Sequence, residues 1–430
     1  MQLGVRSAPG VAASGGTAVW VTLLGFLIMT TDGYDLQSAA FAAPALAAQW
    51  NLKGQLLGPV LGASSLGMAF GSIVLGWLGD RAGRKSAFIV CMGLLCVGSL
   101  ASAQAAGLNS LMAYRFVTGL GLGGATPIAT TLVAEWAAAR WRTVAIAIVI
   151  VGVPLGGAIG AALAQHLIPA YGWRAVFLLG GALPLAFLLV ALPLLPESPA
   201  FLARKTANVR QPRAGLLALV SPAHRSATLT IWLSFICNSL ALYGFVNWLP
   251  LVLSKAGLPL QAALRASLLF SLGGVVGSVC GAVLISRYGS RPVGSSIALA
   301  GALASVLVGV TLMASGHAAD ASVQMLTLIA VAGVALNGMQ NFLYAVAANA
   351  YPIDIRASGV GCASAVARGG GVLSSVVGSA YFSLGLPIAQ FFYILAVVIF
   401  LTALCFFYVP THIPAARTRL TAGEAGNYIG

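Results

Sequence analysis

Long runs of apolar residues, separated by short polar segments, occupy almost the whole chain. A transmembrane helix needs about 20 consecutive apolar residues, and twelve of the runs reach that length. Because lipid offers the backbone no hydrogen-bond partner, a run of this kind is expected to be an α-helix. The pattern therefore predicts an all-α membrane protein with twelve transmembrane helices. The predicted spans are 19–40, 54–79, 86–106, 109–134, 143–167, 173–195, 226–252, 260–286, 292–315, 321–349, 357–384 and 387–409.

The composition agrees with a protein whose main solvent is lipid. Of the 430 residues, 59% are hydrophobic and only 7% are charged, whereas a soluble domain carries about 25% charged residues. The first 18 residues lack the charged start, short apolar stretch and cleavage site of a signal peptide, so we expect the first span to be retained. The six cysteines lie in apolar runs without Cys-x-x-Cys spacing, which favours helix packing over a metal or disulfide role.

Lysine and arginine are distributed unequally between the two sides of the predicted membrane. Sixteen fall in one set of loops and tails, and four fall in the alternate loops. Cytoplasmic loops of membrane proteins carry the basic surplus, so we expect both termini in the cytoplasm of a bacterial-type inner membrane. The formal charge of +14 is then a topology signal that favours contact with the lipid bilayer, and no nucleic-acid partner is expected.

The segment 196–225 is the only long polar stretch between spans, and it divides the spans into two sets of six. The two sets resemble each other locally, because Arg142 to Gly157 aligns with Arg356 to Gly371. Repeated halves are typical of secondary transporters, whose sites lie near the midplane between the halves. The expected organisation is an N-terminal tail at 1–18, six-helix bundles at 19–195 and 226–409, a cytoplasmic linker at 196–225 and a C-terminal tail at 410–430.

Short stretches of the sequence resemble the signatures of a transporter superfamily. The stretch Gly76-Trp77-Leu78-Gly79-Asp80-Arg81-Ala82-Gly83-Arg84-Lys85 closely resembles the loop signature of the major facilitator superfamily. The stretch Asp32-Gly33-Tyr34-Asp35 resembles the signature of its aromatic acid:proton symporter family. This resemblance covers essentially the whole chain. It implies the major facilitator fold and the import of benzoate-like carboxylates, such as hydroxybenzoates, with protons.

Asp32 and Asp35 are the only acidic residues inside a predicted span. They lie about 20–25 Å into the first span at 1.5 Å per residue, and a spacing of three places them on one helical face. Burial and mutual repulsion should raise the affinity of one of them for a proton. We therefore expect the pair to carry the coupled proton, with Arg115 of the fourth span as its counter-ion. A purely structural ion pair, or an Arg115 side chain that reaches for the outer interface, is the alternative.

Arg368 lies near mid-depth in the eleventh predicted span, on a face that otherwise carries small and polar residues. An arginine at this depth should face a cavity rather than lipid. Its planar guanidinium can bind a carboxylate through two parallel hydrogen bonds. We expect it to bind the substrate anion, and an internal hydrogen bond or ion pair is the alternative.

Neutral polar and aromatic residues supply the remaining candidates for substrate binding. Four of them form one polar stripe along the tenth predicted span at positions 0, 3, 4 and 7. Their amides and hydroxyl suit a ring that bears hydroxyl groups, although hydrogen bonding between helices is the alternative. Aromatic side chains of the first span could stack on such a ring. The expected substrate-binding residues are Arg368, Asn337, Gln340, Asn341, Tyr344, Asn238, Tyr34 and Phe41.

Charged residues also gather at the predicted cytoplasmic ends of the first six spans. The resemblance implies that Asp80 holds the two halves together when the transporter faces outward. An ion-pair network that breaks in the other state can bias a two-state equilibrium. Exposed, unpaired charges are the alternative. The expected cytoplasmic gate comprises Asp80, Arg81, Arg84, Glu135, Arg142 and Glu197.

The sequence contains no sign of catalysis, because no His, Cys and acid cluster has ligand spacing and no nucleotide-binding loop is present. We expect no cofactor and no metal, with the proton gradient as the driving force. The leading function is the import of an aromatic carboxylate with protons by a monomer. The alternatives are a proton symporter for another organic anion, such as a dicarboxylate, sialic acid or sugar acid, and, third, a drug exporter.

Overall fold

The computed structural model describes residues 15–138, 140–195, 197–198, 201–202, 216–314 and 322–414. Within these residues, twelve helices are long and apolar enough to cross a membrane, which confirms the predicted number. Two short 3₁₀ helices, η1 (Gly54–Leu57) and η2 (Leu216–Val220), accompany them. The first six are α1 (Gly15–Gln49), α2 (Gly58–Ala82), α3 (Arg84–Ala103), α4 (Leu108–Trp136), α5 (Arg142–Tyr171) and α6 (Arg174–Leu194). The second six are α8 (Arg225–Lys255), α9 (Leu260–Tyr288), α10 (Ser290–Ala314), α11 (Val323–Ala350), α12 (Ile353–Ser383) and α13 (Ile388–Phe407).

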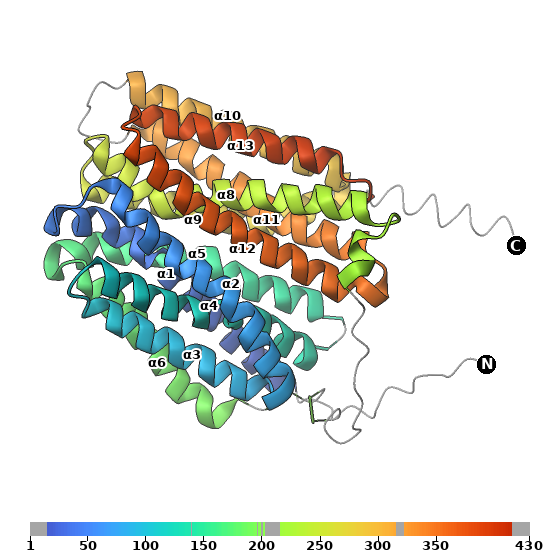
Figure 1. Cartoon of the computed structure of the whole chain (residues 1–430). Coiled ribbons are helices and arrows are strands. Elements are labelled where there is room, and N and C mark those ends of the chain that lie inside the picture. Colours follow the sequence, from blue (N-terminus) through green and yellow to red (C-terminus); the bar gives the residue numbers. More distant parts are fainter. Residues whose placement is uncertain are drawn as a thin grey trace, which may run out of the picture.

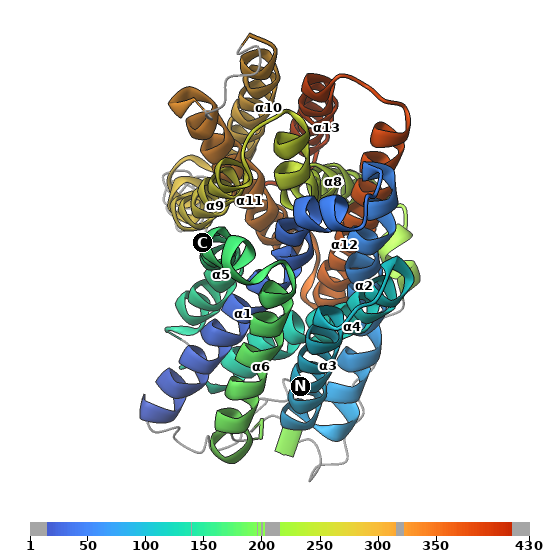
Figure 2. The ribbon, with the colours of Figure 1, turned by 90° about the vertical axis from the view of Figure 1, so that its left-hand side faces the viewer.

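The two sets of six helices repeat one packing pattern. In the first half, α1 packs against α5, α2 against α4, and α3 against α6. In the second half, α8 packs against α12, α9 against α11, and α10 against α13. Each pair in one half has its counterpart in the other, and the two bundles lie side by side (Figures 1 and 2). The internal repeat in the sequence therefore corresponds to a repeated structural unit.

The first residues of α1 and the last residues of α13 lie at the same end of the bundle, which is on the right in Figure 1. We call this the terminal end, and the opposite one, which carries η1, the far end. Most of the predicted linker and most of both predicted tails lie outside the described residues. The loop between α2 and α3 also lies at the terminal end, because α1 and α2 together cross the bundle twice and return the chain to the end at which α1 begins (Figure 1).

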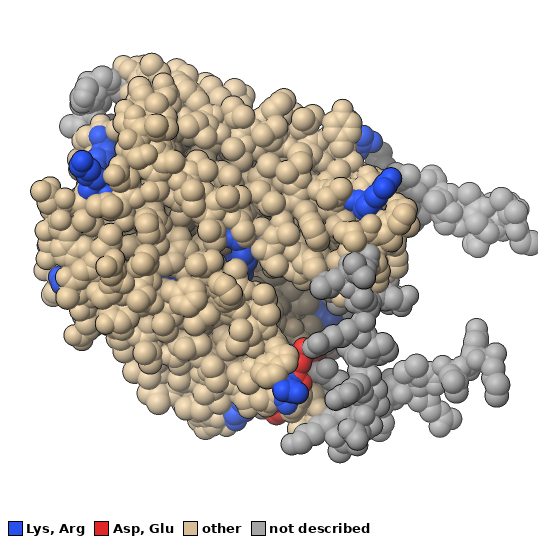
Figure 3. Space-filling model, viewed as in Figure 1, with Lys and Arg blue, Asp and Glu red and all other residues tan. Residues whose placement is uncertain are grey.

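The two halves contact each other mainly through α2 with α12, α5 with α9, and α1 with α8. At the far end, the Ser379 hydroxyl donates a hydrogen bond to the Gln55 carbonyl oxygen at 2.6 Å. At mid-depth, the Ser271 hydroxyl donates to the Gln37 side-chain oxygen at 3.3 Å. No hydrogen bond or ion pair between the halves lies closer to the terminal end than Arg368, within the described part of the chain. The surface is hollowed between the halves toward the terminal end (Figure 3).

Close contact between α1 and α5 depends on glycine. A Cβ atom on Gly33 would lie 1.9 Å from the carbonyl oxygen of Val153, and one on Gly156 would lie 1.9 Å from that of Thr30. Only a residue without a side chain allows the two backbones to approach this closely, as in other membrane helix pairs. Gly33 follows Asp32 directly, so this contact fixes the rotation of α1 that carries the acidic residue.

Candidate functional site

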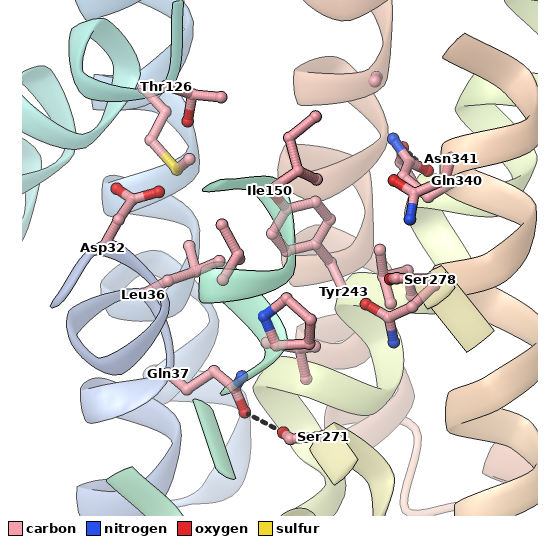
Figure 4. Close-up of a pocket in the computed structure, with 18 of the residues that line it drawn as sticks. Asp32, Leu36, Gln37, Thr126, Ile150, Tyr243, Ser271, Ser278, Gln340 and Asn341 are labelled. Atoms are coloured by element: carbon pink, nitrogen blue, oxygen red, sulfur yellow. Dashed lines mark hydrogen bonds between the residues drawn. The ribbon is translucent and has the colours of Figure 1, made fainter. Parts of the chain in front are cut away.

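A cavity of about 150 Å³ lies between the two halves near the middle of the bundle. Its walls come from both halves, with Asp32 of α1 and Thr126 of α4 on one side and residues of α8, α9, α11 and α12 on the other. Figure 4 shows Asp32 and Thr126 beside each other, across the cavity from Gln340 and Asn341. The predicted residues that line the cavity are Asp32, Arg368, Asn337, Gln340, Asn341 and Tyr344.

Asp32 is a buried carboxylate that faces the cavity. Its side chain is 2% exposed, and its Oδ1 atom has no hydrogen-bond partner among the described residues. Arg368 of the second half is close enough to interact with it electrostatically. An acidic group with an unused oxygen at this depth is suited to binding a proton from the cavity.

Asp35 occupies a different environment from Asp32, although the two are three residues apart. Its Oδ2 accepts a hydrogen bond from Arg115 Nη1 at 3.0 Å, and its Oδ1 accepts one from the Ser99 hydroxyl at 2.7 Å. Arg115 also donates to the Asp35 backbone oxygen and to the Ser64 hydroxyl. Asp35 and Arg115 are both fully buried, and neither lines the cavity.

The Asp35–Arg115 pair therefore joins α1, α2, α3 and α4 inside the first half. This arrangement corresponds to the structural ion pair that the sequence left as an alternative. The three residues expected to act together in proton coupling, Asp32, Asp35 and Arg115, therefore lie in two different environments, because only Asp32 faces the cavity. Arg115 does not extend toward the outer interface, since its guanidinium is engaged in this network and lies over the Phe177 ring at 5.6 Å.

Arg368 projects from the middle of α12 into the opposite wall of the cavity. Its Nη1 donates to the Tyr243 hydroxyl at 3.2 Å and lies 3.7 Å from the Met68 sulfur. No carboxylate lies within 4.0 Å of it in the described part of the chain, where the only ion pairs are Asp80 with Arg84 and Asp35 with Arg115. The cavity thus contains a guanidinium whose direct partners are both neutral.

The amide residues of α11 line the same wall but differ in how far they are engaged. The Gln340 side-chain oxygen accepts a hydrogen bond from Asn238 Nδ2 at 2.7 Å, and Asn337 Nδ2 donates to the Gly333 carbonyl oxygen at 3.1 Å. The Tyr344 hydroxyl lies 3.3 Å from the Ser364 hydroxyl. The Asn341 amide has no hydrogen bond to another described residue, so its donors and acceptor are available to a ligand in the cavity.

Comparison with known proteins agrees with this geometry. A sequence profile of the Major Facilitator Superfamily matches residues 21–319. The chain belongs to the major facilitator superfamily. It is 34% identical to the gallate transporter of Pseudomonas putida, over 90% of each chain. It is 33% identical to the 4-hydroxybenzoate transporter PcaK of Pseudomonas aeruginosa, over 85% of this chain and 86% of the relative.

The fold of the superfamily is also found among solved structures. The crystal structure of a D-xylose–proton symporter superposes with a TM-score of 0.75 at 20% identity, over 91% of this chain and 98% of the other. This likeness concerns the fold alone. The family profile and the sequence relatives identify the chain as a multi-pass membrane transporter of the aromatic acid branch of the major facilitator superfamily, and not an enzyme.

Three of the expected substrate-binding residues do not line the cavity. Tyr34 is 2% exposed, and its hydroxyl donates to the Val176 carbonyl oxygen at 2.9 Å. Phe41 is fully buried in a cluster with Tyr34. Asn238 is also fully buried and acts on the site only through its hydrogen bond to Gln340. Both aromatic residues therefore belong to helix packing, because they face the interior of the first half and its seam with α9.

The structure adds residues to the site beyond the expected substrate-binding set. Tyr243 holds Arg368, while Gln37 and Ser271 form a hydrogen bond between the halves at one side of the cavity (Figure 4). Thr126 and Ser278 are further lining residues. Ser271 and Ser278 are seven residues apart on α9 and so share a helical face, which is a pattern that could have marked them.

The loop signature of the superfamily forms a compact network at the terminal end of the first half. Asp80 pairs with Arg84 at 2.8 Å, and Glu197 accepts hydrogen bonds from the backbone N–H groups of Arg84 and Lys85 at 2.8 and 3.2 Å. Ser198 links this group to Glu135. Four of the six expected gate residues therefore meet, and the contacts of this group among the described residues reach only the first half and the start of the linker.

The other two expected gate residues, Arg81 and Arg142, are exposed and take no part in this network. The Arg81 guanidinium lies over the Trp77 ring at 4.7 Å instead. Among the described residues, this network does not bridge the two halves.

Proposed function

We propose that this chain is a proton-coupled symporter that imports aromatic carboxylates across a bacterial inner membrane, with its terminal end in the cytoplasm. The observation that supports this most directly is Arg368, a guanidinium at mid-membrane depth whose direct partners are neutral. A charge at the bilayer centre costs at least about 2.5 kcal/mol on insertion scales, so an opposite charge in direct contact would stabilise it. A substrate carboxylate, held through two parallel hydrogen bonds, supplies one.

The size and walls of the cavity favour a single aromatic ring. A cavity of about 150 Å³ holds one benzene molecule in other proteins. Tyr243, Tyr344 and Phe270 contribute aromatic surface to the walls, and Asn341 offers an unused amide. Relatives at about one-third identity are transporters of gallate and 4-hydroxybenzoate, which are ring carboxylates that bear hydroxyl groups. A sugar acid or sialic acid would make poor use of these aromatic walls.

The proton is assigned to Asp32 rather than to the pair with Asp35. Asp32 faces the cavity with a free oxygen, whereas both Asp35 oxygens are occupied by Arg115 and Ser99. In the empty site, Asp32 and Arg368 balance each other across the cavity. When a substrate carboxylate takes over Arg368, the Asp32 charge loses its counter-ion, and protonation of Asp32 restores neutrality. Substrate binding and proton binding are coupled in this way.

The orientation follows from the basic surplus, since sixteen of the lysines and arginines belong to the set of loops and tails that includes both termini. The structure then corresponds to a state that is open to the cytoplasm. Release to the cytoplasm is followed by closure at the terminal end, where Asp80 can reach the other half. Opening to the outside breaks the hydrogen bonds of Gln37 with Ser271 and of Gln55 with Ser379. One chain contains the whole site, so a monomer is sufficient.

The test uses two assays of labelled 4-hydroxybenzoate in proteoliposomes. Counterflow measures substrate exchange, and net uptake is measured in parallel with and without a protonophore. Arg368→Ala should raise the apparent substrate constant about tenfold or more, because a charge-assisted hydrogen bond contributes about 1.5–3 kcal/mol. Arg265→Ala serves as the matched control, since Arg265 is exposed near the far end. An unchanged substrate constant in Arg368→Ala, or net accumulation that survives the protonophore, would refute the proposal.

A further inference from the structure

The cavity contains one acidic and one basic side chain. Asp32 and Arg368 are the carboxylate and the guanidinium among the residues that line it, and Tyr243 and Tyr344 are its two phenols. The titratable groups that face Asp32 are Arg368 and Tyr243 from the second half, Cys91 of α3, and Asp35 of its own helix. Cys91 is a buried thiol, so it contributes no charge near pH 7.

The neighbouring charged residues, Asp35 and Arg115, do not contribute to the net charge of the cavity. Asp35 and Arg115 neutralise each other at 3.0 Å, and both are fully buried away from the cavity. A proton entering from the cavity therefore meets one available carboxylate, and an anion meets one available cation.

We infer that the site carries one proton with one monocarboxylate, so that transport is electrically neutral. The inference rests on the proposed function and adds the proton number and the charge class of the substrate. In the loaded form, Asp32 is protonated and Arg368 pairs with the substrate carboxylate, which leaves no net charge. In the empty form, ionised Asp32 balances Arg368, which again leaves no net charge.

The two incompletely loaded forms carry a net charge at mid-depth. Substrate without a proton leaves an excess of one negative charge, and a proton without substrate leaves an excess of one positive charge. The cost of a charge at the bilayer centre suppresses each of these forms about a hundredfold relative to the neutral ones. The halves therefore exchange between their two states mainly when the site is fully loaded or fully empty, which prevents a proton leak.

The same balance excludes dicarboxylates. A second carboxylate on the ring would find no second basic side chain, because Arg368 is the only one among the described residues that line the cavity. Terephthalate has the ring and first carboxylate of 4-hydroxybenzoate, with a carboxylate in place of the hydroxyl group. We expect it to compete at least a hundredfold less well, because its additional charge has no partner.

The experiment combines two measurements on the purified protein in proteoliposomes. A pH electrode in lightly buffered medium records the protons taken up with a pulse of labelled 4-hydroxybenzoate, and solid-supported membrane electrophysiology records charge movement after a substrate jump. Protein-free vesicles give the passive entry of the neutral acid, which is subtracted. The expected results are one proton per substrate and no transport current. A ratio of two with a positive inward current would overturn the inference, and so would terephthalate competing as well as 4-hydroxybenzoate.

Asp32→Asn provides an independent arm, because it fixes the site in a form equivalent to the protonated one. We expect counterflow exchange to persist and to lose its pH dependence, and no protons to accompany the substrate. Proton uptake with substrate in this variant would place the proton elsewhere and overturn the inference. Counterflow in the wild type distinguishes a failure of the proposed function from a failure of the proposed stoichiometry. Its absence contradicts the proposed function, whereas counterflow with a wrong proton ratio contradicts only the stoichiometry.

Discussion

Asp35→Asn and Asp32→Asn are chemically identical changes on one helix, and the structure predicts unequal effects on stability. Asp35→Asn removes the charge that neutralises Arg115, whose side chain is fully buried. Breaking a buried ion pair by removing one partner costs about 3–5 kcal/mol, because the remaining charge is uncompensated. The asparagine can still accept one hydrogen bond, and Arg115 keeps those to Ser64 and to the backbone at position 35. We therefore expect the free energy of unfolding of Asp35→Asn to fall by about 3 kcal/mol, at the lower end of that range.

Asp32→Asn should leave the fold intact. The Asp32 Oδ1 atom has no hydrogen-bond partner among the described residues, so an amide replaces a charge without removing a contact there. The empty site then lacks the counter-charge of Arg368, so some loss in the free energy of unfolding is expected, but a smaller one than in Asp35→Asn, because Arg368 lines a cavity and keeps its hydrogen bond to Tyr243. The main phenotype of this variant is expected in proton coupling.

The assay is the thermal stability of the detergent-solubilised protein, followed by size-exclusion chromatography after heating. Asp35→Asn should lower the midpoint well below that of the wild type, while Asp32→Asn should lower it clearly less. The double variant Asp35→Asn/Arg115→Gln removes both charges and should recover part of the loss. Equal destabilisation by the two single variants, or none by Asp35→Asn, would show that the separation of the two carboxylates is wrong.

Three other features give predictions of their own. Asn341→Leu should weaken binding of 4-hydroxybenzoate up to about tenfold and leave benzoate unchanged in competition assays, because only the hydroxylated ring uses the amide. Gly33→Ala should prevent stable folding, since its Cβ would lie 1.9 Å from the Val153 carbonyl oxygen, whereas Gly93→Ala should be neutral because nothing lies within 4 Å; expression and size-exclusion profiles compare them. Burial and nearby Arg291 lower the pKa of His412, so its side chain is neutral while the segment around His412 is held against Ser290. Protonation of His412 as the pH falls below about 6.5 should loosen this segment, and faster amide exchange at Ile413 would report it.

The number of spans could be predicted from the sequence because it depends on composition and length alone. The ends could not, and the first span illustrates why. The apolar run suggested 19–40, whereas α1 extends from Gly15 to Gln49. Its last turns contain alanine and leucine that pack against the rest of the bundle, so the helix continues beyond the predicted end.

The different roles of Asp32 and Asp35 could not be predicted from spacing. Residues three apart on a helix are about 60° apart around its axis, which is compatible with both facing a cavity or only one. The contact of Gly33 with Val153 sets the rotation of α1, and that contact belongs to tertiary packing. Tyr34 and Phe41 show the same limit, because an aromatic side chain that packs between helices has the same sequence context as one that lines a site.

The terminal-end network was easier to predict because its residues belong to a short motif with a fixed turn. Asp80 and Arg84 are four residues apart across the turn at Gly83, whose φ of 101° favours glycine. Their ion pair follows from that local geometry. The exposed positions of Arg81 and Arg142 do not, since a long side chain at a helix end has several partners within reach.

The repeated packing explains why the two charges of the site face each other. Gly156 of α5 contacts the backbone of α1 at Thr30 and Tyr34, and Gly370 of α12 contacts that of α8 at Ile236 and Leu240. These matching contacts pair Asp32 with Asn238, and Arg368 with Pro154, as equivalent positions of the two halves. Each half therefore has the same two positions at the same depth, and only one of the two carries a charged residue, Asp32 in the first half and Arg368 in the second. One acid on the first half and one base on the second make the attraction between the halves depend on whether a proton and an anion are bound, which a symmetric pair of neutral halves could not achieve.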